Sequence, residues 1–406
     1  MTPNRMRTLP ILAIFLVAYL TAGIFTELEF IEKKPLPERL VSDFRLYKAA
    51  YKQALSGDSP YNDVFLYPPP ALLVIDLFSH VPNALLQYAF YLTINIVLLC
   101  LIVYGIARLY GLKIEQMWFW FPLALGFAPV LGLLHYGQIN IITSFGIFLL
   151  FYAQQSLPAV SGLGLSLAIV TKFSPLVLLG YLGATRQSKA ILWTFVSILI
   201  LCIIALLRYG PTPFTDYPHA LSNLFALNSD DLYAQALVSK LANINRVEAM
   251  DWSITQPLKE TLKPVQQYAR EHPRTFQNLL LAYFGAILLV SGLITLKSRE
   301  REPLFIVTSL SMLFYPNLIW YHHYVFLILP LMIWMASSNL RPAVVVWCLM
   351  GLFVVQADRW HLTYGFLIHL FGHISIWAIL IAQVRSYLGR IRKEKQKGAG
   401  QASSGA

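Results

Sequence analysis

Residues 191–207 read ILWTFVSILILCIIALL, an uncharged and almost wholly apolar run. A run of this length can cross the hydrocarbon core of a bilayer as a helix. Similar runs recur between Leu9 and Val384, and only 13% of the 406 residues are charged. Soluble proteins carry roughly 25% charged residues. The sequence therefore predicts an all-α polytopic membrane protein.

The apolar runs predict about twelve crossings in one integral-membrane domain over residues 1–384, with large extracytoplasmic loops at residues 26–70 and 208–274. The expected crossings are residues 9–25, 85–107, 118–134, 139–152, 191–207, 276–296, 304–320, 324–337, 343–355 and 362–384, with a broken segment at 159–184. The run 9–25 is read as a retained helix, because no small-residue cleavage site follows it. Residues 71–80 are too short to cross and are placed at the outer interface or as a re-entrant segment.

Basic residues set the orientation of these runs. Cytoplasmic short loops collect Lys and Arg, so the loops with Arg108, Lys113, Arg186 and Lys189 are predicted to lie inside. The net charge of +11 is then a topology signal and not a nucleic-acid footprint. Residues 385–406 are basic, then small and polar, and are expected to form a disordered cytoplasmic tail.

The segment 159–184 is interrupted around Lys172 and Pro175. One continuous span would put Arg186 and Lys189 outside, whereas two half-helices keep them inside. We favour two half-helices because the proline and the charges agree. Such a break is tolerated at membrane depth where it lines a cavity. Lys172 is then a candidate for binding a phosphate, and the N-terminal dipole of the helix that follows it would add to the attraction. The alternative is that the lysine side chain only snorkels to the membrane interface.

The loop after the first apolar run carries Asp43 just outside the membrane. An acid bordering a bilayer is costly unless it is paired or useful. Inverting glycosyl transfer uses a carboxylate to take the proton of an acceptor hydroxyl, and we interpret Asp43 as such a catalytic base. The alternative is a helix N-cap by Ser42 or Asp43. A helix over residues 43–55 is predicted from helical spacing of Phe44, Tyr47, Ala50, Tyr51 and Ala54.

Further candidates stand at the predicted outer face. Gln138 and Asn140 lie in a hairpin between spans, where amides can bind sugar hydroxyls; a capped turn with Gly137 is the alternative. His322 and His323 are expected to contact a donor phosphate or sugar, or else to belong to an interfacial aromatic belt. Adjacent histidines rarely ligate one ion, and the three cysteines lie in apolar runs, so no metal or cofactor is expected.

Four arginines are predicted to be outside, and one of them is expected to clamp a phosphate. The sequence does not select among Arg208, Arg246, Arg274 and Arg359; Arg208 is carried forward as the candidate. Tyr61 in the stretch 57–61 (GDSPY) is a further candidate for binding the donor phosphate or sugar.

The order of these motifs resembles glycosyltransferase family 87. The resemblance rests on Asp43 with Tyr47, GDSPY at 57–61, Tyr67-Pro68, GQIN at 137–140, Lys172 with Pro175, and His322-His323 followed by Pro330. It implies a GT-C-type fold, an active site on the extracytoplasmic face of the inner (plasma) membrane, and no nucleotide sugar. It also implies that Asp43 is the catalytic loop acid and that His322 or His323 lies near the donor.

The expected partners are a polyprenyl-phosphate sugar donor, a glycan or glycolipid acceptor, and membrane lipids, without nucleic acid. Mannose is the expected sugar, as in polyprenol-phosphate-mannose-dependent α-mannosyltransferases of this family. Residues 317–321 read NLIWY where such members tend to carry Ser-Trp, which leaves the sugar and acceptor open. A transporter or flippase of lipid-linked sugars is the rival interpretation, although the spans show no repeat of halves.

Overall fold

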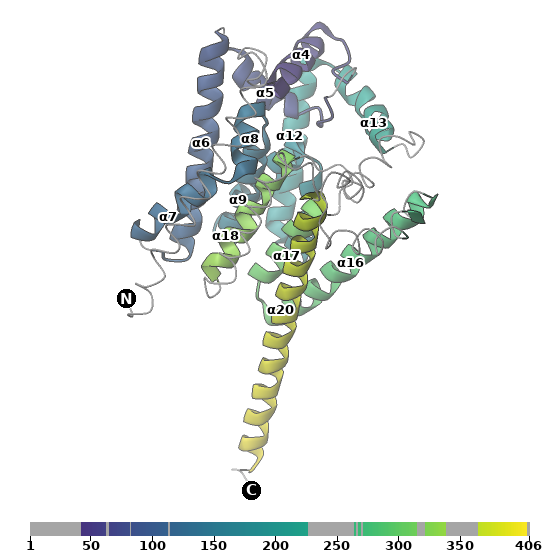
Figure 1. Cartoon of the computed structure of the whole chain (residues 1–406). Helices are drawn as coiled ribbons and strands as arrows, with labels where there is room; N and C mark the ends of the chain where they lie inside the picture. The colour runs from purple at the N-terminus through teal and green to yellow at the C-terminus, as the bar shows by residue number, and fades with distance from the viewer. Residues whose placement is uncertain are drawn as a thin grey trace, which may run out of the picture.

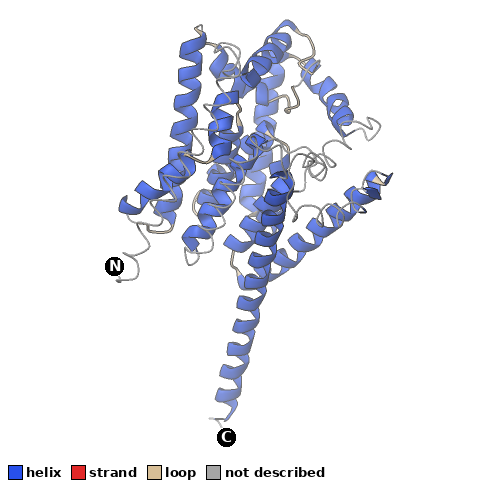
Figure 2. Ribbon diagram, viewed as in Figure 1, coloured by secondary structure: helices blue, strands red, loops and turns tan. Residues whose placement is uncertain are grey.

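The computed structural model describes residues 42–61, 65–81, 83–112, 114–225, 264, 267–268, 271–314, 321–337 and 364–403. In these ranges all regular structure is helical (Figure 2), which confirms the all-α prediction. The expected crossings at 9–25 and 343–355 lie outside the described residues.

The elements follow one another along the chain as shown in Figure 1. They are α4 (Ser42–Ser56), α5 (Ala71–Ser79), α6 (Ala84–Leu109), α7 (Ile114–Leu125), α8 (Ala128–Tyr136), α9 (Asn140–Ala153), α10 (Pro158–Thr171), η1 (Ser174–Val177), α11 (Leu178–Ala184), α12 (Ser188–Tyr209), α13 (Thr212–Phe225), α16 (Pro273–Ser298), α17 (Glu302–Phe314), η3 (Tyr321–Leu327), α18 (Ile328–Ser337) and α20 (Tyr364–Ser403).

Three helical stretches in the described part of the chain are long and apolar enough to cross a membrane. They are Leu86–Leu109, Ser188–Tyr209 and Asn278–Ser298. The other apolar helices are shorter, at 10–17 residues. Membrane association follows from these helices, while the full count of twelve crossings stays a prediction.

Three expected elements differ in the structure. Residues 118–134 were expected as one span but form α7 and α8, separated at Gly126 and Phe127. Pro129 sits in the first turn of α8, where it is tolerated, but it could not continue a helix arriving from α7. Residues 324–337 begin in the 3-10 helix η3 and become α-helical only at Ile328.

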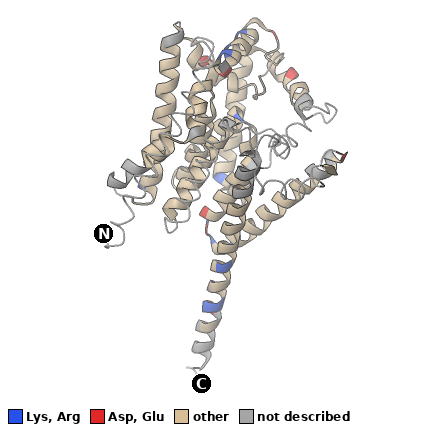
Figure 3. Cartoon of the chain, in the orientation of Figure 1, with Lys and Arg blue, Asp and Glu red and all other residues tan. Residues whose placement is uncertain are grey.

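The C-terminal region is the third difference. Residues 385–403 continue α20 as helix, where a disordered tail was expected. Lys, Arg, Glu and Gln are good helix formers, and a helix already started in the apolar part extends at little cost. Figure 3 shows Lys and Arg along this projecting part of α20.

The predicted break in 159–184 is confirmed. α10 ends at Thr171, Lys172 is extended with φ −162° and ψ 131°, and the chain resumes as η1 with Pro175 in its first turn. The lysine is therefore the C-cap of α10: its backbone N–H still donates to the Ala168 carbonyl at 2.9 Å, but its extended backbone ends the helix before η1.

Glycines let α10 pack tightly between α9 and α12. A Cβ at Gly164 would lie 2.6 Å from the carbonyl oxygen of Gly146 and 2.6 Å from the Cβ of Leu149. Gly162 is as close to the backbone of α12, at Ala190 and Thr194. Close backbone approach through small residues is the usual way in which membrane helices associate.

Gly164→Ala is expected to destabilise the protein by about 1–3 kcal/mol, because neither the Gly146 carbonyl nor the α9 backbone can move away easily. Gly180→Ala in α11 is the matched control, since its Cβ would meet no atom within 4 Å. Thermal unfolding of both variants in nanodiscs tests this. Equal melting temperatures would mean that the α9–α10 contact is looser than described.

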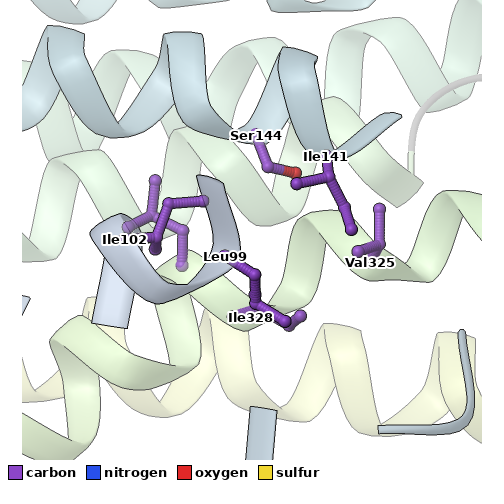
Figure 4. A pocket seen from close by; sticks show the side chains of 7 residues that line it. Leu99, Ile102, Ile141, Ser144, Val325 and Ile328 are labelled. Atoms are coloured by element: carbon purple, nitrogen blue, oxygen red, sulfur yellow. The ribbon is translucent and has the colours of Figure 1, made fainter. Parts of the chain in front are cut away.

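Two groups of buried side chains form the interior. The larger group contains side chains from every helix between α6 and α12 and from α16, α17, η3, α18 and α20. Figure 4 shows one of its joints, where Leu99, Ile102, Ile141, Ser144, Val325 and Ile328 meet. The space among them is too small for a water molecule, so this joint is packing and not a binding site.

The second group lies under α4, and we call it the α4 core. Its members are Phe44, Tyr47, Ala50, Tyr51, Ala54, Phe65, Ala71, Leu72, Ile75, Phe78, Tyr91, Ile139, Ile142, Ala205 and Tyr209. The segment 71–80 thus forms the short helix α5 packed beside α4 (Figure 1). The α4 core packs α4 and Phe65, which belong to the first predicted outer loop, against the ends of α6, α8, α9 and α12. This packing positions the candidate site.

Candidate functional site

Three polar side chains of α4 lie along one stripe that faces the interior. Asp43, Tyr47 and Tyr51 are spaced by four residues, so they lie on the same side of the helix. The predicted apolar face is confirmed, since Phe44, Tyr47, Ala50, Tyr51 and Ala54 are all buried. Asp43 lies in the first turn of α4, where an acid interacts favourably with the helix dipole. Its carboxylate also contacts Gln138.

The junction of α8 and α9 brings Gln138 to this stripe. Gly137 ends α8 in the left-handed conformation with φ 77°, which a residue with a Cβ adopts only at a cost. The backbone N–H groups of Gly137 and Gln138 both donate to the Leu133 carbonyl, at 3.0 and 3.1 Å. The Tyr91 hydroxyl donates to the Gln138 carbonyl at 2.6 Å. The capped turn is therefore real, and it fixes the buried Gln138 in place.

The Gln138 side chain links Asp43 to two tyrosines. Its Nε2 donates to the Asp43 carboxylate, and its Oε1 accepts from the Tyr47 hydroxyl at 2.7 Å and the Tyr67 hydroxyl at 3.1 Å. The two hydroxyls lie 2.8 Å apart. A carboxylate only accepts hydrogen bonds, so the amide nitrogen must face Asp43 and the tyrosines must face the amide oxygen. Burial raises the pKa of Tyr47 and of Tyr67, which keeps both phenols protonated.

Aromatic rings continue outward from this network, and we call them the aromatic wall: Tyr61, Phe65, Tyr67 and Tyr217. Tyr67 packs on Phe65 at 5.5 Å between centroids, Phe65 on Tyr61 at 5.7 Å, and Tyr61 on Tyr217 at 5.5 Å. The Tyr61 hydroxyl donates to the Tyr67 carbonyl at 3.2 Å. Tyr217 comes from α13, so both predicted outer loops contribute to the wall.

Lys172 and His323 share a second neighbourhood. The Lys172 Nζ lies 5.4 Å from the centre of the Phe326 ring, and the His323 ring lies 6.5 Å from the same ring. His323 is buried, while the side chain of His322 lies outside what the structure describes.

This neighbourhood is tied to the same end of α9 as Gln138. The hydroxyls of Thr171, just before Lys172, and Thr143, in the first turn of α9, lie 2.9 Å apart. η3 packs against both α8 and α9. Asn140, which is buried, is the first residue of α9. The fold therefore gathers Asp43, Gln138, Asn140, Lys172 and His323 around the α8–α9 junction.

Arg208 lies in a neighbouring cluster. Its Nε is 3.4 Å from Oδ2 of Asp76. The other oxygen, Oδ1, accepts from the Tyr51 hydroxyl at 2.5 Å and lies 2.9 Å from His80 Nε2. This cluster ties α4, α5 and the end of α12 together. Asp76 was not among the predicted site residues, although it is the one acid in the apolar segment 71–80 and could have been recognised by that position.

Two tyrosines near the site were not predicted from the sequence, and two of the candidate arginines lie outside the described residues. Tyr91 and Tyr217 gave no signal in the sequence, because tyrosines are frequent throughout. Arg246 and Arg359 lie outside the described residues. In the described part of the chain no group of three or more His, Cys, Asp or Glu side chains could hold a metal ion.

Comparison with known proteins gives one family. The family model described as glycosyltransferase family 87 matches residues 65–330, which is more than half of the chain. Gln138, Asn140, Lys172, Arg208 and the histidine pair fall inside the match, whereas Asp43 and Tyr61 precede it. A search of curated proteins found no relative of this chain. The chain therefore belongs to glycosyltransferase family 87 and is a glycosyltransferase.

Proposed function

We propose that this glycosyltransferase transfers a sugar, mannose by the family resemblance, from a polyprenyl monophosphate to a glycan or glycolipid acceptor on the extracytoplasmic side of the inner membrane, with Asp43 as the general base. The observation that carries the proposal is the contact of Asp43 with Gln138. It holds one carboxylate at the meeting point of α4, the segment 65–70 and the α8–α9 junction.

The chemistry needs one base and one stabilised leaving group. Asp43 accepts the proton of the acceptor hydroxyl while that oxygen bonds to the anomeric carbon of the donor. The bond between this carbon and the phosphate oxygen breaks, and polyprenyl phosphate leaves with the electron pair. Gln138 has one amide hydrogen bond to the carboxylate and so orients it without supplying a proton.

The departing phosphate requires positive charge or hydrogen-bond donors. Lys172 is suited to this role because it ends α10 in an extended conformation beside Phe326 and stands just before η1. His323 is near the same ring, and His322 is its alternative. Arg208 is a weaker candidate, since Asp76 already faces its guanidinium. Contacts that strengthen as the phosphate leaves lower the barrier.

The rival interpretation as a transporter or flippase has less support. The family match is to transferases. Asp43, Asp76 and Arg208 lie on α4, α5 and the end of α12, which pack together around the α4 core. A transporter is expected to carry such groups near the bilayer midplane.

The direct test uses the full chain in nanodiscs. It is incubated with a panel of polyprenyl-phosphate sugars and an octyl glycoside as acceptor, and release of polyprenyl phosphate is measured together with the glycosylated product. Product from one donor of the panel supports the proposal. Absence of both product and polyprenyl phosphate with every donor contradicts it.

Gln138→Glu is expected to move the acidic limb of the pH–rate profile to higher pH. The new carboxylate would face Asp43, and two facing carboxylates cannot both ionise easily, so the pKa of the pair is raised. The base works only when ionised, so activity is lost at a higher pH on acidification. The pH dependence of kcat/KM is the measurement, and Gln53→Glu, further along α4, is the control. An unshifted limb would mean that position 138 does not act on the base.

A further inference from the structure

Two of the later helices, α16 and α20, pack side by side and run in the same direction. Hydrogen bonds tie them at two levels. The Trp377 Nε1 donates to the Tyr283 hydroxyl at 2.9 Å, and the Ser291 hydroxyl donates to Oε1 of Gln383 at 2.8 Å. The partners are 94 and 92 residues apart in the chain. The two helices therefore keep nearly one register along their contact.

A groove with a volume of about 500 Å³ lies between α16 and α20, and it includes Tyr283 and Trp377 at one end. Its apolar walls recur at spacings of three and four residues, so each helix contributes one continuous stripe. The wall residues are Ala286, Ile287 and Val290 from α16, and Leu380, Ile381 and Val384 from α20. Trp377 and Ile381 are 45% and 46% exposed, so the groove is open to the surroundings of the helices.

The length of the groove suits an acyl chain of one bilayer leaflet. Trp377 and Arg385, at its two ends, are eight residues apart in α20, which is about 12 Å along a helix. Half of the hydrocarbon core of a bilayer is about 15 Å thick. α16 contains a stretch, Asn278–Ser298, that is long enough to cross the membrane. The groove thus lies where one leaflet of lipid would reach it.

The charge of the groove is at one end. Arg385 is exposed and is the one charged residue of its lining. Within the described ranges no carboxylate pairs with Arg385, whereas Arg390, further along α20, pairs with Glu300. Figure 3 shows that Lys and Arg continue along α20 beyond this point. The ends of both helices are predicted to be cytoplasmic, and basic pockets between membrane helices on that side bind anionic lipid head groups.

We propose that the groove between α16 and α20 binds an anionic phospholipid of the cytoplasmic leaflet. The lipid phosphate lies at Arg385, and one acyl chain follows the apolar walls toward Trp377. The bound chain fills the space between the two helices and so adds to their packing. The groups proposed for the donor phosphate, Lys172 and His323, do not line this groove. The site is therefore separate from the one proposed for the sugar donor.

The head group is tested with dioleoyl phosphatidylglycerol, titrated against the full chain in detergent, with dioleoyl phosphatidylcholine as the zwitterionic comparison. Native mass spectrometry counts the bound lipids. The wild type is expected to prefer the anionic lipid about fivefold, the effect of one basic side chain on an anionic head group. Arg385→Ala should remove this preference and Arg385→Lys should keep it.

Arg392→Ala is the matched control for the charge. Arg392 is exposed on α20 about two turns beyond Arg385, and it does not line the groove. Its loss should leave the preference for phosphatidylglycerol unchanged. The proposal is overturned by equal binding of the two lipids to the wild type, and also by the same preference in Arg385→Ala as in Arg392→Ala. In the latter case Arg385 only snorkels.

The acyl chain is tested by filling the groove. Ala286→Trp places a large ring between the walls and should remove the most tightly bound lipid, whereas Leu289→Trp adds the same ring to α16 at a position that is 62% exposed and outside the groove. Unchanged lipid binding in Ala286→Trp contradicts the proposal. Displacement of phosphatidylglycerol by a lower concentration of polyprenyl phosphate also contradicts it, because the groove would then belong to the donor lipid. None of these outcomes depends on transferase activity, so the proposed function stands or fails separately.

Discussion

Asp43→Asn is expected to lower turnover by about 10²–10⁴-fold, which is the usual loss when a general base is removed. Asparagine has the same shape and its side-chain oxygen can still accept from the Gln138 amide. Folding and donor binding should therefore stay close to those of the wild type. Steady-state rates in nanodiscs, together with melting temperatures, give the measurement.

Asp58→Asn is the control for Asp43→Asn. Asp58 is an exposed acid in the turn after α4, where the Ser56 hydroxyl donates to it at 3.0 Å. Its loss should leave turnover near the wild-type rate. Within the described ranges, Asp76 lies beside the α4 core and Asp216 acts electrostatically on Tyr61 of the aromatic wall. If Asp43→Asn keeps more than about a tenth of the wild-type rate, the base must be sought among these acids.

Lys172→Ala is expected to weaken donor binding by about ten- to a hundredfold. A charge-assisted contact to phosphate contributes roughly 1.5–3 kcal/mol, and 1.4 kcal/mol is one decade of affinity. The measurement is a titration with a non-transferable polyprenyl-phosphate sugar analogue. Lys172→Arg, which keeps the charge, should lose much less affinity.

Lys189→Ala serves as the control for a lysine that only sets topology. It lies in the first turn of α12, in the loop predicted to be cytoplasmic. Donor affinity should be unchanged in this variant. Unchanged affinity in Lys172→Ala as well would return Lys172 to a snorkelling role.

Much of the local structure was predictable because its signals are local. The helix over 43–55 and its buried face follow from the spacing of apolar residues. The break at Lys172 follows from Pro175 and the flanking charges. The separation of α7 from α8 was missed because the apolar composition of 118–134 continues through it. The helical C-terminal region was missed because charge and small residues suggested disorder more strongly than helix propensity suggested order.

For the candidate site, too, the sequence indicated individual residues but not how they contact one another. Asp43, Gln138, Asn140, Lys172 and the histidine pair were recognisable as polar residues in apolar or loop surroundings, and their order pointed to the family. Their roles relative to one another were not. The sugar contact expected of Gln138 stays a prediction, and the structure adds that its amide nitrogen donates to Asp43. The phosphate contact expected of Arg208 also stays a prediction, and the structure adds that its guanidinium faces Asp76.

Hydropathy, proline and charge act over a few neighbouring residues, so the sequence was enough to predict the class of protein, most of the helical elements and the list of polar candidates. Tertiary structure alone decided which candidates meet. Asp43 and Gln138 are 95 residues apart in the chain, and Tyr217 reaches Tyr61 from the other predicted loop. Their contact depends on the packing of α4 over α8 and α9 and on the path of α12 into α13. Such long-range packing leaves no periodic trace in a single sequence, which is why the orientation of the base and the position of Tyr217 had to be read from the fold.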